Sequence, residues 1–169
     1  EGKYTGYYTN GIKQKEGQYT NGKETGEWKQ WFDDGTLQQE INYQNGQALL
    51  MNLWLTKEKQ AIINGNGKIE IAYDSGQKKA EGNYVGGLMQ GDWQFYTTKG
   101  EKDYTVTFVK GKKNGTYTSW FKDGTLKSQG NFTNDKKNGY WKWYKPQGKI
   151  EMEGTLNNEQ RAGKWMYCF

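Results

Sequence analysis

The residues that most often carry out catalysis are scarce in this sequence, which has no histidine and a single cysteine, Cys168. Without histidine, Ser-His-Asp and Cys-His catalysis are excluded, and the commonest metal ligand is missing. Cys168 lies in an aromatic stretch without a candidate base, so we interpret it as a small buried filler. One cysteine also excludes a disulfide framework within a monomer.

The carboxylates that could act as an acid and base pair are placed where turns are expected. Asp33, Asp34, Asp74 and Asp123 all lie in such places, where a carboxylate stabilises the turn backbone. A glycosidase-like pair could still be assembled from the turns of adjacent units. The glycines fit turns and packing, and no phosphate-binding loop precedes a helix. We therefore expect a non-enzymatic protein that needs no metal and no cofactor.

Aromatic residues are the most distinctive chemical feature of the sequence, which contains 8 Trp, 13 Tyr and 6 Phe. Only 33% of residues are hydrophobic, and the mean hydropathy is −1.16. A large aliphatic core is excluded, and so is a disordered chain, because disordered chains contain few aromatics. The composition predicts a thin structure that is held together by aromatic side chains.

The chain is an array of units about 24 residues long. Full units open at Gly2, Gly26, Gly67, Gly91, Gly115 and Gly139, and residues 163–169 form a terminal half-unit. An irregular insert at about 48–66 interrupts the period, and its two apolar runs suggest an atypical hairpin. Positions within a unit are numbered here from the opening glycine. We expect a single array over residues 1–169.

Each unit is predicted to be a β-hairpin, because runs of about six residues rich in Trp, Tyr, Phe and Thr alternate with turn dipeptides. The expected fold is therefore all-β, with tandem hairpins in an elongated, twisted, single-layer antiparallel sheet. Asn10-Gly11 predicts a type I′ turn. The small residue at position 16, such as Gly130, leaves room for an aromatic side chain of the neighbouring hairpin.

Strand alternation places positions 3, 5 and 7 on one face and position 6 on the other, unless a bulge lies between positions 5 and 6. Most of the aromatic side chains are expected to form the core of the array. One face could remain open and bind a peptide, a glycan or a quaternary ammonium group. The candidate binding face consists of Trp28, Trp31, Trp93, Tyr96, Trp120, Trp141 and Trp143.

A second candidate surface is a basic edge formed by stacked loops. Its residues are Lys112, Lys113, Lys136 and Lys137. Such an edge protects a sheet against aggregation, and it could also attract anionic lipid head groups or an acidic protein. Nucleic acid is disfavoured because acidic residues dilute the charge, and the net charge is only +5.

The repeated unit resembles the bacterial variant of the MORN repeat. The pattern is carried by Trp28, Trp31, Phe32, Gly35 and Leu37 in one copy, and by Tyr117, Trp120, Phe121, Gly124, Leu126, Gly130 and Phe132 in another. The resemblance covers nearly the whole chain outside residues 48–66. It implies a string of hairpins with an aromatic groove. Proteins of this kind are often labelled antitoxins of toxin–antitoxin pairs, and others resemble secreted or surface proteins.

Three functions remain open at this point. The first is a monomeric, non-catalytic scaffold for a protein partner such as a toxin, a host component or an envelope component. The second is a glycan- or choline-binding cell-wall module, although the spacing between Trp and the aromatic pair departs from that pattern. The third is a structural spacer. The sequence begins at Glu1 and not at methionine, for which a removed signal peptide is one explanation and a trimmed sequence is another. Of the two locations, we favour an extracytoplasmic over a cytoplasmic one.

Overall fold

A computed structural model describes residues 1–168, which form antiparallel strands and no helix. Strand-favouring residues and turn dipeptides alternate throughout the chain, so every connection between consecutive strands is short. The strands are β1 (Gly2–Tyr7), β2 (Lys13–Thr20), β3 (Lys23–Trp31), β4 (Leu37–Gln44), β5 (Gln47–Thr56), β6 (Lys59–Ile62), β7 (Gly67–Ala72), β8 (Lys78–Val85), β9 (Leu88–Tyr96), β10 (Lys102–Val109), β11 (Lys112–Trp120), β12 (Leu126–Thr133), β13 (Lys136–Tyr144), β14 (Ile150–Asn157) and β15 (Gln160–Tyr167).

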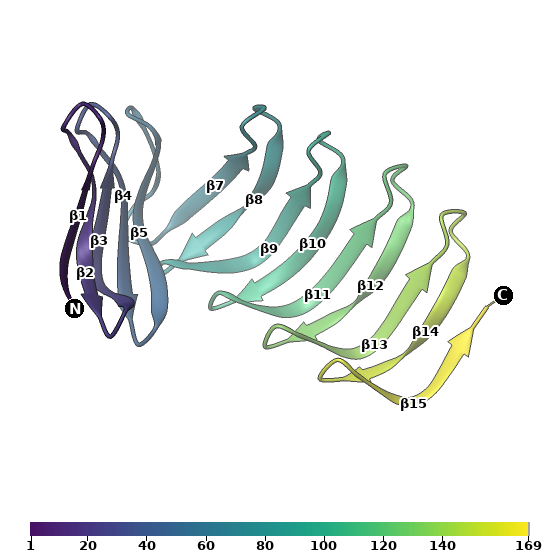
Figure 1. Cartoon of the computed structure of the whole chain (residues 1–169). Coiled ribbons are helices and arrows are strands. Elements are labelled where there is room, and N and C mark those ends of the chain that lie inside the picture. Colours follow the sequence, from purple (N-terminus) through teal and green to yellow (C-terminus); the bar gives the residue numbers. More distant parts are fainter. Residues whose placement is uncertain (169) are drawn as a thin grey trace. The chain divides into compact units, whose positions relative to one another are not determined.

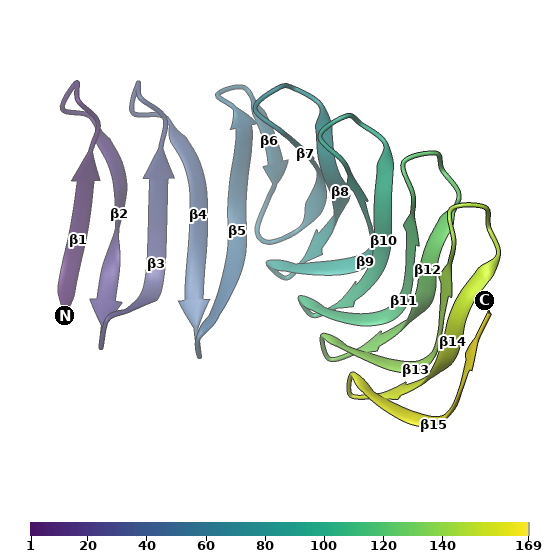
Figure 2. The same ribbon diagram turned by 45° about the vertical axis from the view of Figure 1, so that its right-hand side comes forward.

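The strands pair with their neighbours in the sequence and form two sheets (Figures 1 and 2). One sheet runs from β1 to β6 and the other from β7 to β15, and all pairs are antiparallel. The expected all-β array of hairpins is therefore confirmed. Strand pairing is interrupted between β6 and β7, which belong to different sheets. Residues 48–66 hold most of β5 and all of β6, and β5 pairs with both β4 and β6.

The chain divides into two compact units. The first comprises Glu1–Ile69 with Tyr84–Leu88, and the second comprises Glu70–Asn83 with Met89–Phe169. Main-chain hydrogen bonds explain why the β8–β9 turn belongs to the first unit. The Gly87 oxygen accepts from the Leu50 N–H at 2.9 Å, and the Gly87 N–H donates to the Gly65 oxygen at 2.8 Å.

The hairpins that join even-numbered to odd-numbered strands turn over two residues, both with positive φ. The pairs include Asn21-Gly22, Lys110-Gly111 and Asn134-Asp135. This combination defines a type I′ turn, whose twist matches that of the flanking strands. The predicted type I′ turn at Asn10-Gly11 is wrong, because only Gly11 has a positive φ. That connection is a longer loop, in which the Tyr8 N–H donates to the Ile12 oxygen.

One irregularity recurs in the ladders beside the aromatic side chains of position 6. The register shifts between positions 5 and 6, as at Ser119/Trp120 and Trp143/Tyr144. The partner strand contributes one extra residue there, which is the mark of a β-bulge. Because the extra residue lies on the partner strand, positions 5 and 6 remain consecutive and alternate, so position 6 stays on the face opposite to positions 3 and 5, as the alternation predicts.

The core of the array is built by indole rings that lie on glycine. Trp141 is fully buried, and a Cβ added to Gly130 would lie 2.2 Å from its Cδ2 atom. The same arrangement joins Gly17 to Trp28 and Gly82 to Trp93. The predicted role of the position 16 glycine is confirmed. In the unit at Gly91, position 16 is Val106 and not glycine. Position 3 of the next unit is then Tyr117 and not a tryptophan.

No helix in the part of the chain that the structure describes is long and apolar enough to span a membrane. Cys168 is exposed, so the prediction of a buried filler is wrong. Its main-chain N–H donates to the Glu151 oxygen at 2.9 Å, which extends the β14–β15 pairing past the last strand residue.

Candidate binding site

A continuous row of aromatic rings runs along one face of the nine-stranded sheet. Consecutive ring centres lie 4.4–6.1 Å apart. These spacings suit offset and tilted aromatic pairs. The row consists of Trp93, Phe95, Tyr104, Tyr117, Trp141, Trp143 and Trp165.

Burial decides the role of four of the predicted binding residues, of which Trp93, Trp141 and Trp143 belong to the row and Trp28 to the six-stranded sheet. Trp28, Trp93 and Trp141 are at most 2% exposed, so a partner cannot reach their rings. The indole N–H groups of Trp93 and Trp141 donate to main-chain oxygens of Asn83 and Asn131. Trp143 is half-buried and stacks between Trp141 and Trp165.

The other three predicted residues, Trp31, Tyr96 and Trp120, occupy position 6 beyond the bulge and are half-buried. The structure therefore does not bring the seven candidates together on one face. Lysine ammonium groups lie over two of the position 6 rings. Lys13 Nζ is 5.2 Å from the Trp31 ring centre, and Lys78 Nζ is 5.6 Å from that of Tyr96. Such contacts are favourable because the ring face is negative.

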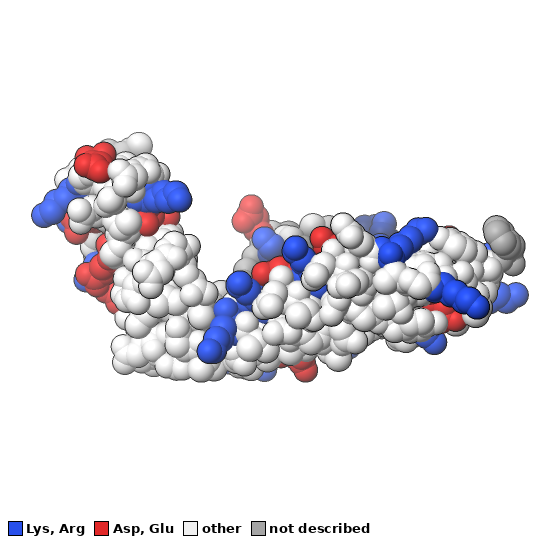
Figure 3. Space-filling view, turned by 90° about the horizontal axis from the view of Figure 1, so that it is seen from below, with Lys and Arg blue, Asp and Glu red and all other residues white. Residues whose placement is uncertain are grey.

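The predicted basic edge is also divided between two faces, because adjacent strand residues alternate. Lys112 and Lys136 are exposed. Lys137 instead folds over the aromatic row, with Nζ 4.8 Å from the Trp141 ring centre, and Lys113 Nζ lies 5.3 Å from that of Phe132. Figure 3 shows basic side chains at intervals over the molecular surface, among uncharged residues.

A hollow with a volume of about 460 Å³ lies on the nine-stranded sheet. Its apolar wall is formed by Trp120 at the end of β11 and by Phe121 in the following turn. Its other lining residues are Thr97, Lys102, Asp103, Lys122, Asp123 and Lys127. A neighbouring hollow shares Lys102, Trp120, Phe121 and Lys122.

Local sequence explains why the wall of the hollow is held in place. The Asp123 carboxylate accepts from the Thr125 N–H at 2.9 Å and from the Thr125 hydroxyl at 2.6 Å, which fixes the β11–β12 turn. These bonds lower the pKa of Asp123. Lys127 Nζ lies 6.0 Å from the Phe121 ring centre. The turn therefore presents Phe121 and the flanking lysines as a fixed group.

Of the predicted residues, only Trp120 lines this hollow. Sequence reasoning missed Thr97, Lys102, Phe121, Lys122 and Lys127. The available signal was the unit alignment, in which Phe121 occupies position 7 next to Trp120, and Lys102 occupies position 12. The contact between residues of consecutive units could not be read from one unit alone.

The hairpin order, the recurring bulges and the glycine-seated indoles define a repeat protein of tandem β-hairpins. The MORN repeat variant family matches residues 1–21, 24–45, 113–134 and 137–158, which together make up more than half of the chain. The chain belongs to the MORN repeat variant family.

No curated protein matches the chain. Among solved structures, the chain is similar to one titled "Crystal Structure of TarM", with a TM-score of 0.31 and 10% sequence identity. The matched part covers 69% of this chain and 20% of that chain.

Proposed function

We propose that this protein is a non-catalytic binding module that holds another protein at the Trp120 hollow. The observation that carries the proposal is the composition of the hollow, in which two half-buried aromatic side chains stand beside three lysines. Tryptophan is among the residue types that dominate binding energy in protein interfaces, especially when a rim of weaker contacts excludes water. The volume of about 460 Å³ lies in the range of about 300–1,000 Å³ that is typical of ligand sites.

The burial of three of the candidate indoles supports this choice over the glycan- or choline-binding alternative. A module of that kind would need open indole faces, whereas Trp28, Trp93 and Trp141 are core residues. The partner could be a toxin, a host component or an envelope component, and its identity would follow from capture in the producing cells.

The test is site-specific photocrosslinking in the cells that produce the protein. A photoreactive phenylalanine at position 122 is expected to give one dominant adduct, and the same group at exposed position 68 on β7 is expected to give none. Reversal of Lys102 and Lys127 to glutamate should abolish the adduct from position 122. Reversal of Lys23, Lys59 and Lys68, which are also exposed, should leave it unchanged. Equal labelling from both positions would contradict the proposal.

A further inference from the structure

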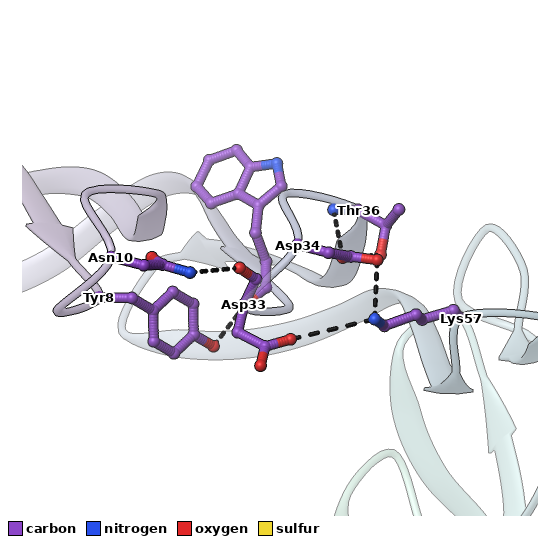
Figure 4. Close-up of polar contacts among 7 residues, drawn as sticks. Tyr8, Asn10, Asp33, Asp34, Thr36 and Lys57 are labelled. Carbon is purple, nitrogen blue, oxygen red and sulfur yellow. Dashed lines mark hydrogen bonds and ion pairs between the residues drawn. The ribbon is translucent and has the colours of Figure 1, made fainter.

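Two units of the array show a slot that is filled from within the chain. The Tyr8 hydroxyl at position 7 donates to the main-chain oxygen of Trp31, at position 6 of the next unit, over 2.8 Å. The Tyr73 hydroxyl donates in the same way to the Tyr96 oxygen over 2.9 Å. Figure 4 shows the first of these slots, where Tyr8 and Asn10 reach towards the turn that contains Asp33. A phenol at position 7 fills this slot in these two units, whereas position 7 of the other four is Phe32, Thr97, Phe121 or Lys145.

The unit that opens at Gly91 lacks this occupant. Its position 7 is Thr97, and the corresponding position 6 of the next unit is Trp120. Among the described residues, no tyrosine hydroxyl donates to the Trp120 main-chain oxygen. The hollow of about 460 Å³ lies beside Thr97, Trp120 and Phe121. A short side chain has thus left open the place that a tyrosine ring fills in the other two units.

The same unit also lacks the acidic partner of its position 12 lysine. Lys13 pairs with Glu16 at 2.7 Å, and Lys78 pairs with Glu81 at 3.1 Å. In both units the acidic partner stands at position 15, whereas the unit at Gly91 has Thr105 there. Lys102 has no ion pair with any described residue, and it lines the hollow. The unit at Gly91 therefore lacks both the phenol at position 7 and the carboxylate at position 15.

We propose that the hollow binds a tyrosine side chain from an acidic segment of the partner protein, an inference that rests on the function proposed above. The tyrosine hydroxyl donates to the main-chain oxygen of Trp120, and its ring fills the space beside Thr97. A carboxylate next to that tyrosine pairs with Lys102. The partner supplies the two groups that other units obtain from their own sequence.

The remaining charges of the hollow agree with an acidic segment. Lys122 and Lys127 add two further cations, whereas Asp103 and Asp123 are the two carboxylates. The Asp123 carboxylate is already engaged by the Thr125 N–H and hydroxyl. Excess positive charge at the rim favours approach of an acidic chain and disfavours a basic one.

The test uses the intact protein and a blocked pentapeptide with one tyrosine between two pairs of glutamates. Titration followed by NMR is expected to give saturable shifts confined to Trp120, Phe121 and their neighbours. The matching phenylalanine peptide lacks one hydrogen bond and should bind about fivefold more weakly. Lys102→Gln should weaken both peptides by a similar factor.

The decisive variant is Thr97→Tyr, which supplies the missing ring from within the chain. It should reduce peptide affinity at least tenfold, and it also removes the hydrogen bonds of the Thr97 hydroxyl with Glu101 and with the Lys99 N–H. Thr98→Tyr is the matched control, because it adds the same ring at an exposed turn position, and it should bind the peptide as the unmodified protein does. If Thr97→Tyr disrupts folding, loss of the shifts on titration of Lys102→Gln serves as the second measurement.

The proposal is overturned if millimolar peptide gives no saturable shift, or if folded Thr97→Tyr protein binds the peptide normally. Equal affinity for the tyrosine and phenylalanine peptides would show that the tyrosine hydroxyl does not contribute to binding. These failures are distinct from failure of the general binding function. If position 122 still crosslinks one protein in cells, the binding module stands and only the tyrosine assignment falls.

Discussion

The contact between Gly130 and Trp141 shows how single residues determine this fold. The indole lies directly on the glycine, so that an added Cβ would be 2.2 Å from the ring. We expect Gly130→Ala to lower the free energy of unfolding by about 3 kcal/mol, the upper part of the range for an overpacked core. Chemical denaturation followed by fluorescence measures the change.

Two further variants test the reason for that loss. Gly6→Ala should change stability by less than about 0.5 kcal/mol, because its Cβ would meet only the end of the exposed Tyr4 side chain. The chain itself pairs Val106 with Tyr117 in the equivalent places. The double variant Gly130→Val with Trp141→Tyr should therefore be more stable than Gly130→Val alone. If it is less stable, steric exclusion is not the cause.

Adjacent lysines on β13 provide a second test at the residue scale. Lys137 Nζ lies 4.8 Å from the Trp141 ring centre and 5.9 Å from that of Trp143, whereas Lys136 is exposed. Lys137→Ala should cost about 0.5–1 kcal/mol of stability through the lost cation–π contact, and Lys136→Ala should cost almost none. Equal losses in thermal denaturation would show that the stacking contributes nothing.

At the scale of the element, the two-residue turns demand positive φ from residues that do not favour it. Lys110 adopts a φ of 50°, where a side chain with a Cβ is strained and Asn is better tolerated. Lys110→Asn should raise stability by about 0.5–1 kcal/mol, as measured by the denaturation midpoint. Asn134, the equivalent residue of the next turn, is the control, and Asn134→Lys should lower stability by a similar amount. No change in either variant would contradict the strain.

The elements could be predicted largely from the sequence, because each unit repeats the same strand residues and turns. The glycine under the indole was predictable for the same reason. The turn at Asn10-Gly11 was not, because the dipeptide permits a type I′ turn without requiring one, and hydrogen bonds from Tyr8 select a longer loop. The division of the ladder between β6 and β7 depends on contacts such as Gly65 with Gly87, which no local pattern encodes.

The candidate site was only partly predictable. Aromatic spacing marked Trp120 together with core residues such as Trp141, because residue type alone does not distinguish a buried ring from a half-buried one. Strand alternation separates position 6 from positions 3 and 5, but which of the two faces is covered appears only in the burial of the folded chain. The open slot at Thr97 becomes visible only when Tyr8 is seen to contact a residue 23 positions further along the chain.

At the scale of the whole molecule, buried tyrosines predict loss of stability in alkali. Burial of the phenol and the neighbouring Glu24 carboxylate raise the pKa of Tyr43 to about 12, and burial also raises the pKa of Tyr84, Tyr104 and Tyr117. The unfolded chain releases these protons near pH 10. The folded state therefore binds more protons between pH 10 and 12, and its stability falls as the pH rises through that range.

Guanidinium denaturation at pH 8, 10 and 11 measures this dependence. The free energy of unfolding should be flat up to about pH 9 and then decline. Tyr43→Phe should decline less steeply, and the contribution of Tyr43 is on the order of 2 kcal/mol at the alkaline end of the range. A free energy that stays constant to pH 11 would contradict the burial of these phenols.

Hydroxyl-radical footprinting can show whether Trp93 and Trp141 are core residues and whether the Trp120 hollow binds a protein. The purified protein and the protein inside its producing cells are compared residue by residue with mass spectrometry. The account predicts that Trp93 and Trp141 remain unmodified in both conditions, since they are at most 1% exposed. Trp120 and Phe121 should be modified in the purified protein and protected in cells. Modification of Trp141, or equal modification of Trp120 in both conditions, would contradict the account.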